Sequence, residues 1–512
     1  MNFPRRPGPT ALIALGYGLL LLSWAVSNSP GSSPDEPAHL TKALGVASGQ
    51  FVGRDADYPV TPEFGPAQLL WINSVTRSFE VPRAATFGTI ATCNAFRPEQ
   101  PSTCITSRLR QRASGRDSME RTHTGSYQPA PYLPIGLAAR LGGAAPGAVI
   151  AGRLVVAAVS LSLIALAAAS LWSAAWRRWS ALGLTVALSP MVIFLSASLS
   201  PSGMEIAGGV AASAGAIAIS RSTERRRIAW VALGAGGTVM ALSRSTGPVW
   251  AAAMLLLVVA LSGVRGAVIR LRAGGGLALG ALVAMALGSA ATFAWDLSFM
   301  PAPPRSPQPG RLFEAVAHLP ELLRQSIGVF GWLDTAMPAL AYTAWRMMLI
   351  AVIGLALLVG NLRERLVLLA ATAAVLAATI GLTLAAVYPT GFDTQARYTL
   401  PIGVAVPLLA GEIVARRRHR VSGLLPERLP LAFAATAAAV HLIGWYANGR
   451  RHGVGIDGPL WFIGRGEWSP PIGWAFWAAV ASAGVALVAG SSIAYGGTRR
   501  GRHTTEHDYP GG

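Results

Sequence analysis

The sequence predicts an all-α, polytopic integral membrane protein with about twelve membrane-crossing helices. Three observations predict this class. The 512 residues are 52% hydrophobic and 13% charged, which leaves too little polar surface to coat a soluble globule. Apolar runs of about 20 residues, the length that crosses a hydrocarbon core of about 30 Å, recur along the chain. The arginines stand in short clusters between these runs, as in the loops of membrane proteins.

The apolar runs define the expected spans. They are 10–27, 146–172, 179–197, 204–220, 228–243, 247–262, 276–294, 338–360, 366–387, 398–415, 428–447 and 472–495. The first run follows Arg5 and Arg6, as in a signal peptide, but no small-x-small cleavage site precedes the acidic segment after it. We therefore expect a retained anchor helix.

The positive-inside rule predicts the topology. The arginine clusters of the short connections all fall on one side of the expected spans, which assigns that side to the cytoplasm. Both termini then lie in the cytoplasm of a multi-pass protein of the plasma membrane. A net charge of +19 would suggest a nucleic-acid partner in a soluble chain. Here the arginines flank spans, so we expect membrane lipid as a partner and no nucleic acid.

These assignments divide the chain into six parts. They are an N-terminal anchor helix (1–27), an extracytoplasmic loop (28–145), spans two to seven (146–294), a second extracytoplasmic segment (295–337), spans eight to twelve (338–498) and a cytoplasmic tail (499–512). The large first loop mixes prolines, charges and aromatic residues, which favours a folded cap of short helices and irregular structure. Its last apolar stretch, 135–141, is too short to span and predicts a re-entrant or interfacial helix. The amphipathic stretch 312–325 predicts a helix on the outer membrane face.

The only two cysteines, Cys93 and Cys104, lie in the first outer loop. An oxidising exterior allows them to pair, and the chain-entropy model gives such a short closed loop roughly 3 kcal/mol. The alternative is two unpaired thiols. Their spacing suits neither a zinc knuckle nor a CxxC redox motif.

The segment after the first span carries the most informative polar residues. Ser33 as N-cap, Pro34 and Glu36 form a capping-box pattern, which predicts a helix from Pro34 to about Ser48. His39 then shares a helix face with Asp35 and Glu36. Such a cluster can act as a general base or hold Mg²⁺ or Mn²⁺, with Asp35 and Glu36 as the metal ligands. Equally, Glu36 can simply cap the helix, and both acids can complement its dipole.

Three arginines lie within or beside spans, toward their predicted outer ends: Arg153, Arg244 and Arg397. A cation at membrane depth is seldom kept without a partner. Together they can hold a lipid-linked phosphate through bidentate hydrogen bonds. The alternative is that they extend toward lipid headgroups.

Two further acids are candidates for the same outer cavity. Glu205 opens a span and either pairs with an arginine or lies near the interface. Asp334 either lines the cavity or caps the helix after it. Walker and dinucleotide fingerprints are missing, as are HExxH and GxSxG, so no nucleotide cofactor is expected.

Four motifs carry a family resemblance. They are Ser33-Pro-Asp-Glu-Pro-Ala-His, Leu188-Ser-Pro-Met-Val-Ile-Phe-Leu with Ser198-Leu-Ser-Pro-Ser-Gly-Met-Glu-Ile-Ala, Phe330-Gly-Trp-Leu-Asp-Thr and Gln395-Ala-Arg-Tyr-Thr-Leu-Pro. The chain from about 10 to 447 resembles a family of predicted bacterial membrane proteins of unknown function that is grouped with the GT-C glycosyltransferases. The resemblance implies a GT-C-like architecture in which an acid of the first outer loop, here Asp35, acts beside the phosphate of a polyprenyl-phosphate sugar donor. Gln395-Ala precedes Arg397 in place of the family's arginine-first form.

The leading hypothesis is an inverting glycosyltransferase, moving a hexosyl or pentosyl group from a polyprenyl-phosphate donor to a cell-envelope glycan outside the membrane. Asp35, Glu36 and His39 would be catalytic, and the three arginines would bind the donor phosphate. One alternative is a non-catalytic transporter or flippase of lipid-linked saccharides, which needs the basic cavity but not the acids. Another is a structural partner in an envelope-assembly complex.

Overall fold

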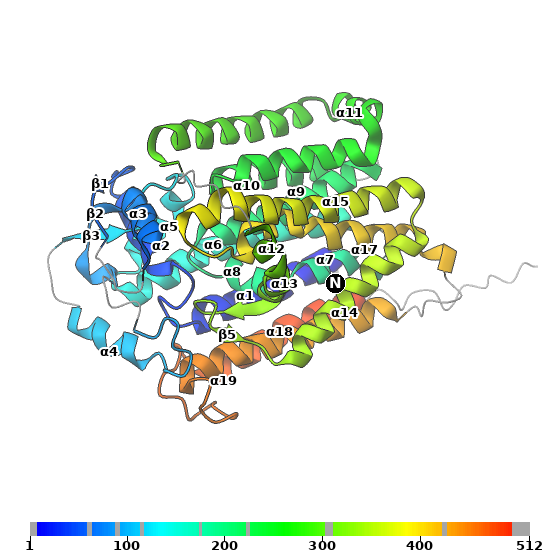
Figure 1. Cartoon of the computed structure of the whole chain (residues 1–512). Helices are drawn as coiled ribbons and strands as arrows, with labels where there is room; N and C mark the ends of the chain where they lie inside the picture. Colours follow the sequence, from blue (N-terminus) through cyan, green and yellow to red (C-terminus); the bar gives the residue numbers. More distant parts are fainter. Residues whose placement is uncertain are drawn as a thin grey trace, which may run out of the picture.

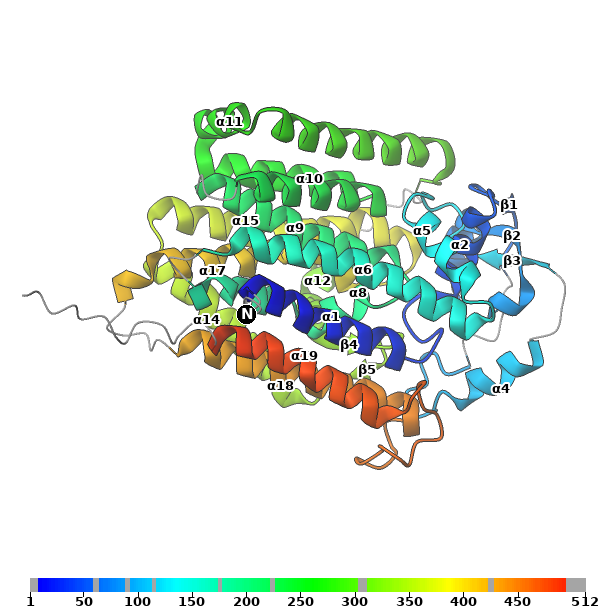
Figure 2. The ribbon, with the colours of Figure 1, turned by 180° about the vertical axis from the view of Figure 1, so that it is seen from behind.

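A computed structural model describes residues 8–58, 64–87, 93–112, 117–173, 177–221, 226–302, 311–421 and 428–493. Long helices run side by side in one bundle, and a smaller cap, built from the described residues of 28–141, covers one end of it (Figures 1 and 2). We call this the cap end. The opposite end, where α9 finishes at Arg221 and α17 at Arg417, is called the arginine-rich end. The tail predicted for 499–512 lies outside the described residues.

The bundle consists of long, mostly apolar helices. They are α1 (Pro9–Ser27), α6 (Ala145–Leu171), α9 (Pro201–Arg221), α10 (Arg226–Ser243), α11 (Gly247–Phe299), α14 (Ala339–Val359), α15 (Leu362–Leu382), α17 (Ala405–Arg417), α18 (Leu429–Val454) and α19 (Trp474–Ile493). Eight helices in the described part of the chain are long and apolar enough to cross a membrane, or nine if one bent pair counts as a span. The chain is thus a helical membrane protein, but the predicted number of twelve spans is not confirmed.

Breaks in the helices explain this difference. The runs 247–262 and 276–294 both fall within α11, but α11 is not one straight span: its backbone is non-helical at Gly263 and Gly275, where φ is 74° and 58°, and the chain doubles back between its two long helical segments (Figures 1 and 2). The run 179–197 forms α7 (Leu182–Ala187) and α8 (Pro190–Ser196), part of a pair bent by 70°. Proline at the first position of α8 and the Ser189 hydroxyl, which accepts from Val192 N, start this new helix. The run 398–415 is divided in the same way, between α16 (Leu400–Gly403) and α17.

The cap contains helices and a small sheet. Its helices are α2 (Glu36–Ala47), α3 (Pro66–Val75), α4 (Thr103–Arg112) and α5 (Tyr132–Leu141), and a 3₁₀ turn covers Arg83–Ala85. The antiparallel strands β1 (Arg54–Asp55), β2 (Arg77–Val81) and β3 (Ser118–Thr122) pair in the order β1-β2-β3. The sequence did not predict this sheet. The helix predicted from 135 is α5, and it packs on α2 so closely that a Cβ at Gly136 would meet the Ala43 carbonyl at 1.9 Å.

The second segment between spans is less regular than predicted. In place of one amphipathic helix over 312–325 there are two short ones, α12 (Arg311–Ala317) and α13 (Leu319–Gly328), followed by a hairpin of β4 (Val329–Phe330) and β5 (Thr335–Ala336). Phe330 is fully buried and lies against Trp24 of α1, with ring centroids 4.9 Å apart. This segment is therefore anchored in the bundle rather than lying wholly on its surface.

Several short helical turns lie between the long helices. A π-helical turn (Thr383–Val387) and two 3₁₀ turns (Tyr388–Thr390 and Ala396–Tyr398) follow α15. Two more 3₁₀ turns, Arg177–Ala181 and Arg418–Val421, lie at the arginine-rich end. The turn Ala396–Tyr398 places Arg397 near the start of α2, although the two segments lie far apart in the sequence.

Candidate functional site

The start of α2 differs from the predicted capping box. The helix begins at Glu36, and its N-cap is Asp35, whose backbone is left-handed with φ 58° and ψ 10° and whose side chain makes no capping hydrogen bond. The Ser33 hydroxyl instead accepts from the Asn28 side-chain amide, 2.9 Å away. Left-handed backbone is strained for a residue with a Cβ, although Asp and Asn tolerate it best, and such strain often occurs at functional sites.

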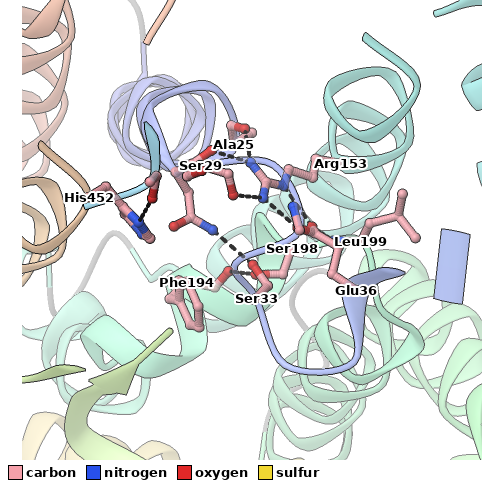
Figure 3. A network of polar contacts seen from close by, with 12 residues as sticks. Ala25, Ser29, Ser33, Glu36, Arg153, Phe194, Ser198, Leu199 and His452 are labelled. Atoms are coloured by element: carbon pink, nitrogen blue, oxygen red, sulfur yellow. Dashed lines mark hydrogen bonds and ion pairs between the residues drawn. The ribbon is translucent and has the colours of Figure 1, made fainter. Parts of the chain in front are cut away.

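Glu36 faces the interior of the bundle, where it pairs with Arg153 of α6 (Figure 3). Arg153 Nε donates to Glu36 Oε1 over 2.7 Å, and Nη2 donates to Oε2 over 2.6 Å. The backbone amides of Leu199 and Gly31 also donate to the carboxylate, at 3.0 and 2.9 Å. Both side chains are fully buried. Glu36 is thus surrounded by its own donors and does not share a site with Asp35.

The remaining donors of Arg153 are also used. Its Nη1 and Nη2 donate to backbone carbonyls at the end of α1 and just after it: Ala25, Asn28 and Ser29. These bonds tie α1, α2, α6 and the turn after α8 together. The structure therefore corrects two predictions. Arg153 has no donor left for an external phosphate, and Glu36 has no free oxygen for catalysis or for a metal ion.

Asp35 points toward a different cation. Arg397 Nη2 donates to Asp35 Oδ2 over 2.6 Å, and His123 Nε2 lies 3.4 Å from Oδ1. The Asp35 side chain is 28% exposed, whereas Arg397 is 4% exposed. Burial alone would raise the pKa of Asp35, but the charges of Arg397 and His123 hold this pKa well below its usual range. Asp35 is therefore an ionised carboxylate near the surface of the cap.

Arg244 and Arg397 both lie against the same aromatic ring. Both guanidinium groups lie over Tyr398, 5.6 and 5.7 Å from the ring centroid. Arg244 Nε is 3.9 Å from a Glu205 carboxylate oxygen, and Thr246 also donates to that carboxylate, over 3.4 Å. Glu205 is fully buried. The predicted pairing of Glu205 with an arginine thus has a direct counterpart in the structure.

Several polar atoms of these arginines have no hydrogen-bond partner among the described residues. They are Nε and Nη1 of Arg397 and Nε of Arg244, all of them buried. Buried donors without partners are rare and call for an explanation such as a water, an ion or a ligand. Because they are guanidinium donors, the group that suits them is an anion.

His39 completes the group, which we call the cap-side cluster: Asp35, His39, His123, Arg244, Arg397 and Tyr398. The His39 Nδ1 atom shares a hydrogen bond of 2.8 Å with the Tyr132 hydroxyl, and Nε2 lies 3.3 Å from the Ser200 hydroxyl. Burial lowers the pKa of His39 well below its ordinary value, with the nearby Asp35 charge opposing this shift. His39 is therefore neutral and positioned by two hydroxyl groups.

Asp334 belongs to another network. Arg451 of α18 donates to Asp334 over 3.1 Å and to the Asn94 carbonyl over 2.6 Å. Cys93 and Cys104 form a disulfide with a Cα–Cα distance of 6.3 Å. The Asp334–Arg451 pair therefore fastens the disulfide loop to α18. The structure corrects the prediction that Asp334 lines the same cavity as Asp35.

The described residues do not fit the predicted metal site. No group of three or more His, Cys, Asp or Glu side chains in the described ranges can hold a metal ion. Asp35 and Glu36 each face their own arginine, so their carboxylates do not converge on a shared cation.

Sequence reasoning missed His123 and Tyr398. His123 lies in the turn after β3, in a sheet that was not predicted, so nothing local connected it with Asp35. Tyr398 directly follows Arg397 in a motif that was recognised, and its aromatic ring was the available signal.

The family described as "Predicted membrane protein (DUF2142)" matches residues 19–406. The chain belongs to this family. The matched region includes the whole cap-side cluster and ends before α18 and α19. No curated protein and no solved structure matches the chain. The family description indicates a membrane protein and names no reaction.

Proposed function

We propose that this protein is a GT-C-type membrane glycosyltransferase that moves a sugar from a polyprenyl-phosphate donor to a cell-envelope glycan on the outer side of the membrane. The observation that carries this proposal is a set of guanidinium nitrogens with no hydrogen-bond partner among the described residues: two belong to Arg397, which contacts the ionised Asp35, and one belongs to Arg244. An anion-binding group next to a carboxylate is the combination that such a transfer needs. Arg153, Glu36 and Asp334 have no part in this proposal, because each is used elsewhere in the fold.

The arrangement suggests the order of events. Arg397 neutralises Asp35 before the donor arrives, which makes the carboxylate a weak base. A donor phosphate that binds Arg397 and Arg244 draws the guanidinium charge away from Asp35. The pKa of Asp35 then rises toward its ordinary value, so the carboxylate becomes a better proton acceptor when the donor is bound.

In the transfer step, the acceptor hydroxyl oxygen forms a bond to the anomeric carbon while the bond from that carbon to the phosphate oxygen breaks. The configuration at the carbon inverts. Asp35 accepts the hydroxyl proton, and the polyprenyl phosphate leaves with the electron pair of the broken bond. Arg244 and Arg397 stabilise the charge on the leaving phosphate. His39 is too enclosed by Tyr132 and Ser200 to accept this proton and instead positions the start of α2.

A second candidate is a transporter or flippase of a lipid-linked saccharide. The Asp35–Arg397 ion pair supports it, because a lipid phosphate that displaces Asp35 from Arg397 can bind and leave without any bond being made. In that case Arg244 and Arg397 are needed and the basicity of Asp35 is not.

The test is genetic restoration with a chemical readout. Cells without the gene are compared with wild type for envelope glycans and for accumulated polyprenyl-linked sugars. Asp35→Asn keeps the shape and the left-handed backbone but removes the base, so we expect it to fail to restore the glycan and to lower transfer by roughly 10²–10⁴-fold. The matched control is Asp55→Asn, also in the cap, where the carboxylate is 93% exposed; it should restore fully.

Each result decides between the candidates. Full restoration by Asp35→Asn, together with failure of Arg244→Gln and Arg397→Gln, would reject the transferase and support the transporter. Full restoration by all three variants would reject both. Folding of every variant is checked from its amount in the membrane fraction and its melting temperature in detergent.

A further inference from the structure

The arginine-rich end holds a cavity of about 250 Å³ between α9, α11, α15 and α17. Five arginines line it: Arg221, Arg270, Arg363, Arg416 and Arg417. Two glutamates, Glu364 and Glu412, lie among them. We call this group of seven residues the basic pocket. Its described lining therefore has an excess of three positive charges. The helix ends of α9 and α17 that contribute to it lie at the end of the bundle opposite the cap (Figures 1 and 2).

The carboxylates of the basic pocket already have partners. Glu412 pairs with Arg221 of α9. Glu364 lies 3.1 Å from Arg417 and 3.7 Å from Arg416, and it also accepts from the Asn361 backbone amide at the start of α15. Each glutamate is thus occupied, and two carboxylates cannot neutralise five guanidinium groups.

Among the described residues, the two other arginines hydrogen-bond only to neutral backbone carbonyls. Arg270 donates to Ile219 O and Ser220 O at the end of α9, both over 2.7 Å. Arg363 donates to Ala260 O over 3.0 Å. Through these bonds each side chain reaches the backbone of a neighbouring helix, and both side chains line the cavity. A carbonyl carries no net charge, so the two positive charges stay uncompensated by the described carboxylates.

The segment of α11 between its two kinks, which contributes to this pocket, has the composition of a helix at the boundary between hydrocarbon and water. From Gly263 to Gly275 the helix carries arginines together with exposed apolar side chains, among them Val264, 70% exposed, and Ile269, 65% exposed. Basic residues beside exposed apolar ones are typical of a helix that lies in the headgroup region. Arg270 belongs to this segment, which supports a position of the pocket near the depth of lipid phosphates.

We propose that the basic pocket binds the phosphate of an anionic membrane lipid. Arginine forks match phosphate oxygens, and basic pockets between transmembrane helices are suited to anionic headgroups. The cavity is slightly smaller than the range of about 300–1,000 Å³ of ordinary small-molecule sites, which fits a headgroup. Leu362 and Leu366 flank Arg363 and are 71% and 56% exposed, so they offer an apolar strip for the acyl chains.

The test uses the full chain, purified in detergent and stripped of native lipid. Phosphatidylglycerol and, in parallel, phosphatidylcholine are titrated, and bound lipid is counted by native mass spectrometry. We expect phosphatidylglycerol to bind at least tenfold more tightly. In the variant Arg363→Gln/Arg416→Gln two donors are removed, and this preference should weaken roughly tenfold or more. Equal binding of the two lipids by the wild type would overturn the proposal.

The matched control removes the same charge from the same end of the molecule. Arg265→Gln/Arg272→Gln changes two arginines of the α11 segment that do not line the pocket. It should keep the preference for phosphatidylglycerol. An equal loss in both double variants would mean general attraction to a basic surface and would overturn the assigned site.

Two further experiments test where the lipid binds and whether its phosphate alone is enough. A photoreactive phosphatidylglycerol added to the wild-type protein should label peptides of α11, α15 or α17, and labelling only elsewhere would overturn the proposal even if the variants fail to fold. Inorganic phosphate at the same concentration should neither compete with the lipid nor raise the melting temperature. Equal competition by inorganic phosphate would assign the pocket to a soluble phosphate and reject the lipid.

Discussion

Asp35 and Glu36 are neighbours in the sequence but occupy very different environments. Glu36 is fully buried, and four donors surround its carboxylate, two of them from Arg153. Asp35 is 28% exposed, has strained backbone, and pairs with Arg397, which keeps two nitrogens without a partner among the described residues. A complete network can only hold the fold together, whereas an incomplete one can exchange its partners for a ligand. This difference in hydrogen bonding shows more clearly than residue type which acid stabilises the fold and which one is able to take part in ligand binding.

The largest expected effect comes from opening the complete network. Glu36→Gln leaves the Arg153 guanidinium buried without a counter-charge, and removal of one partner of a buried pair typically costs about 3–5 kcal/mol. We expect a lower melting temperature in detergent and a lower yield from membranes. The control Glu80→Gln changes an exposed residue of the cap sheet and should behave as wild type. A melting temperature unchanged by Glu36→Gln would show that the pair is not what holds α1, α2 and α6 together.

The strained backbone of Asp35 gives a smaller effect. Asn accepts left-handed backbone nearly as well as Asp, whereas Ala has no polar side chain to favour it, so Asp35→Ala should be less stable than Asp35→Asn by about 1 kcal/mol. Both variants lose the charge of the carboxylate, so the difference between them reflects the left-handed backbone together with the hydrogen bond that the Asn oxygen can still accept from Arg397. Melting temperatures of the two proteins in the same detergent provide the measurement. Identical values would mean that the start of α2 relaxes out of the left-handed conformation.

The features that could be predicted from the sequence were local ones. Apolar runs identify helices because the apolar side chains of each run must be covered by lipid or protein, whichever segments lie next to it. Each predicted run has helical residues in the structure. Whether a run is one span, a bent pair or half of α11 depends on kinks such as Gly263 and Gly275 that packing decides.

Long-range contacts were harder to predict. The pattern around Ser33 satisfies the capping-box rule, but Arg153, 117 residues away, offers Glu36 a stronger partner. Asp35 and Arg397 were both predicted as site residues, and they meet across 362 residues of sequence. His123 could not be placed beside them, because β3 is short and polar and the sheet that positions it was not recognised.

The smallest effect expected is a pH dependence that comes from His39. Its pKa in the folded protein is depressed by burial, whereas in the unfolded chain it returns to an ordinary value of about 6.5. Below this pH the unfolded chain binds a proton that the folded protein does not, and so stability decreases as the pH falls from about 7 to 5. His39→Gln keeps a polar partner for Tyr132 and Ser200 but does not titrate.

The measurement for this prediction is the difference in melting temperature between the two proteins at pH 7.5 and at pH 5. Other buried histidines titrate in both proteins, so the difference isolates His39. We expect the wild type to lose more stability than His39→Gln over this interval. Asp35 does not interfere, because its depressed pKa restricts its own contribution to more acidic conditions. Parallel losses in the two proteins would mean that His39 binds its proton equally well in the folded and unfolded chain, which would contradict the lowering of its pKa by burial.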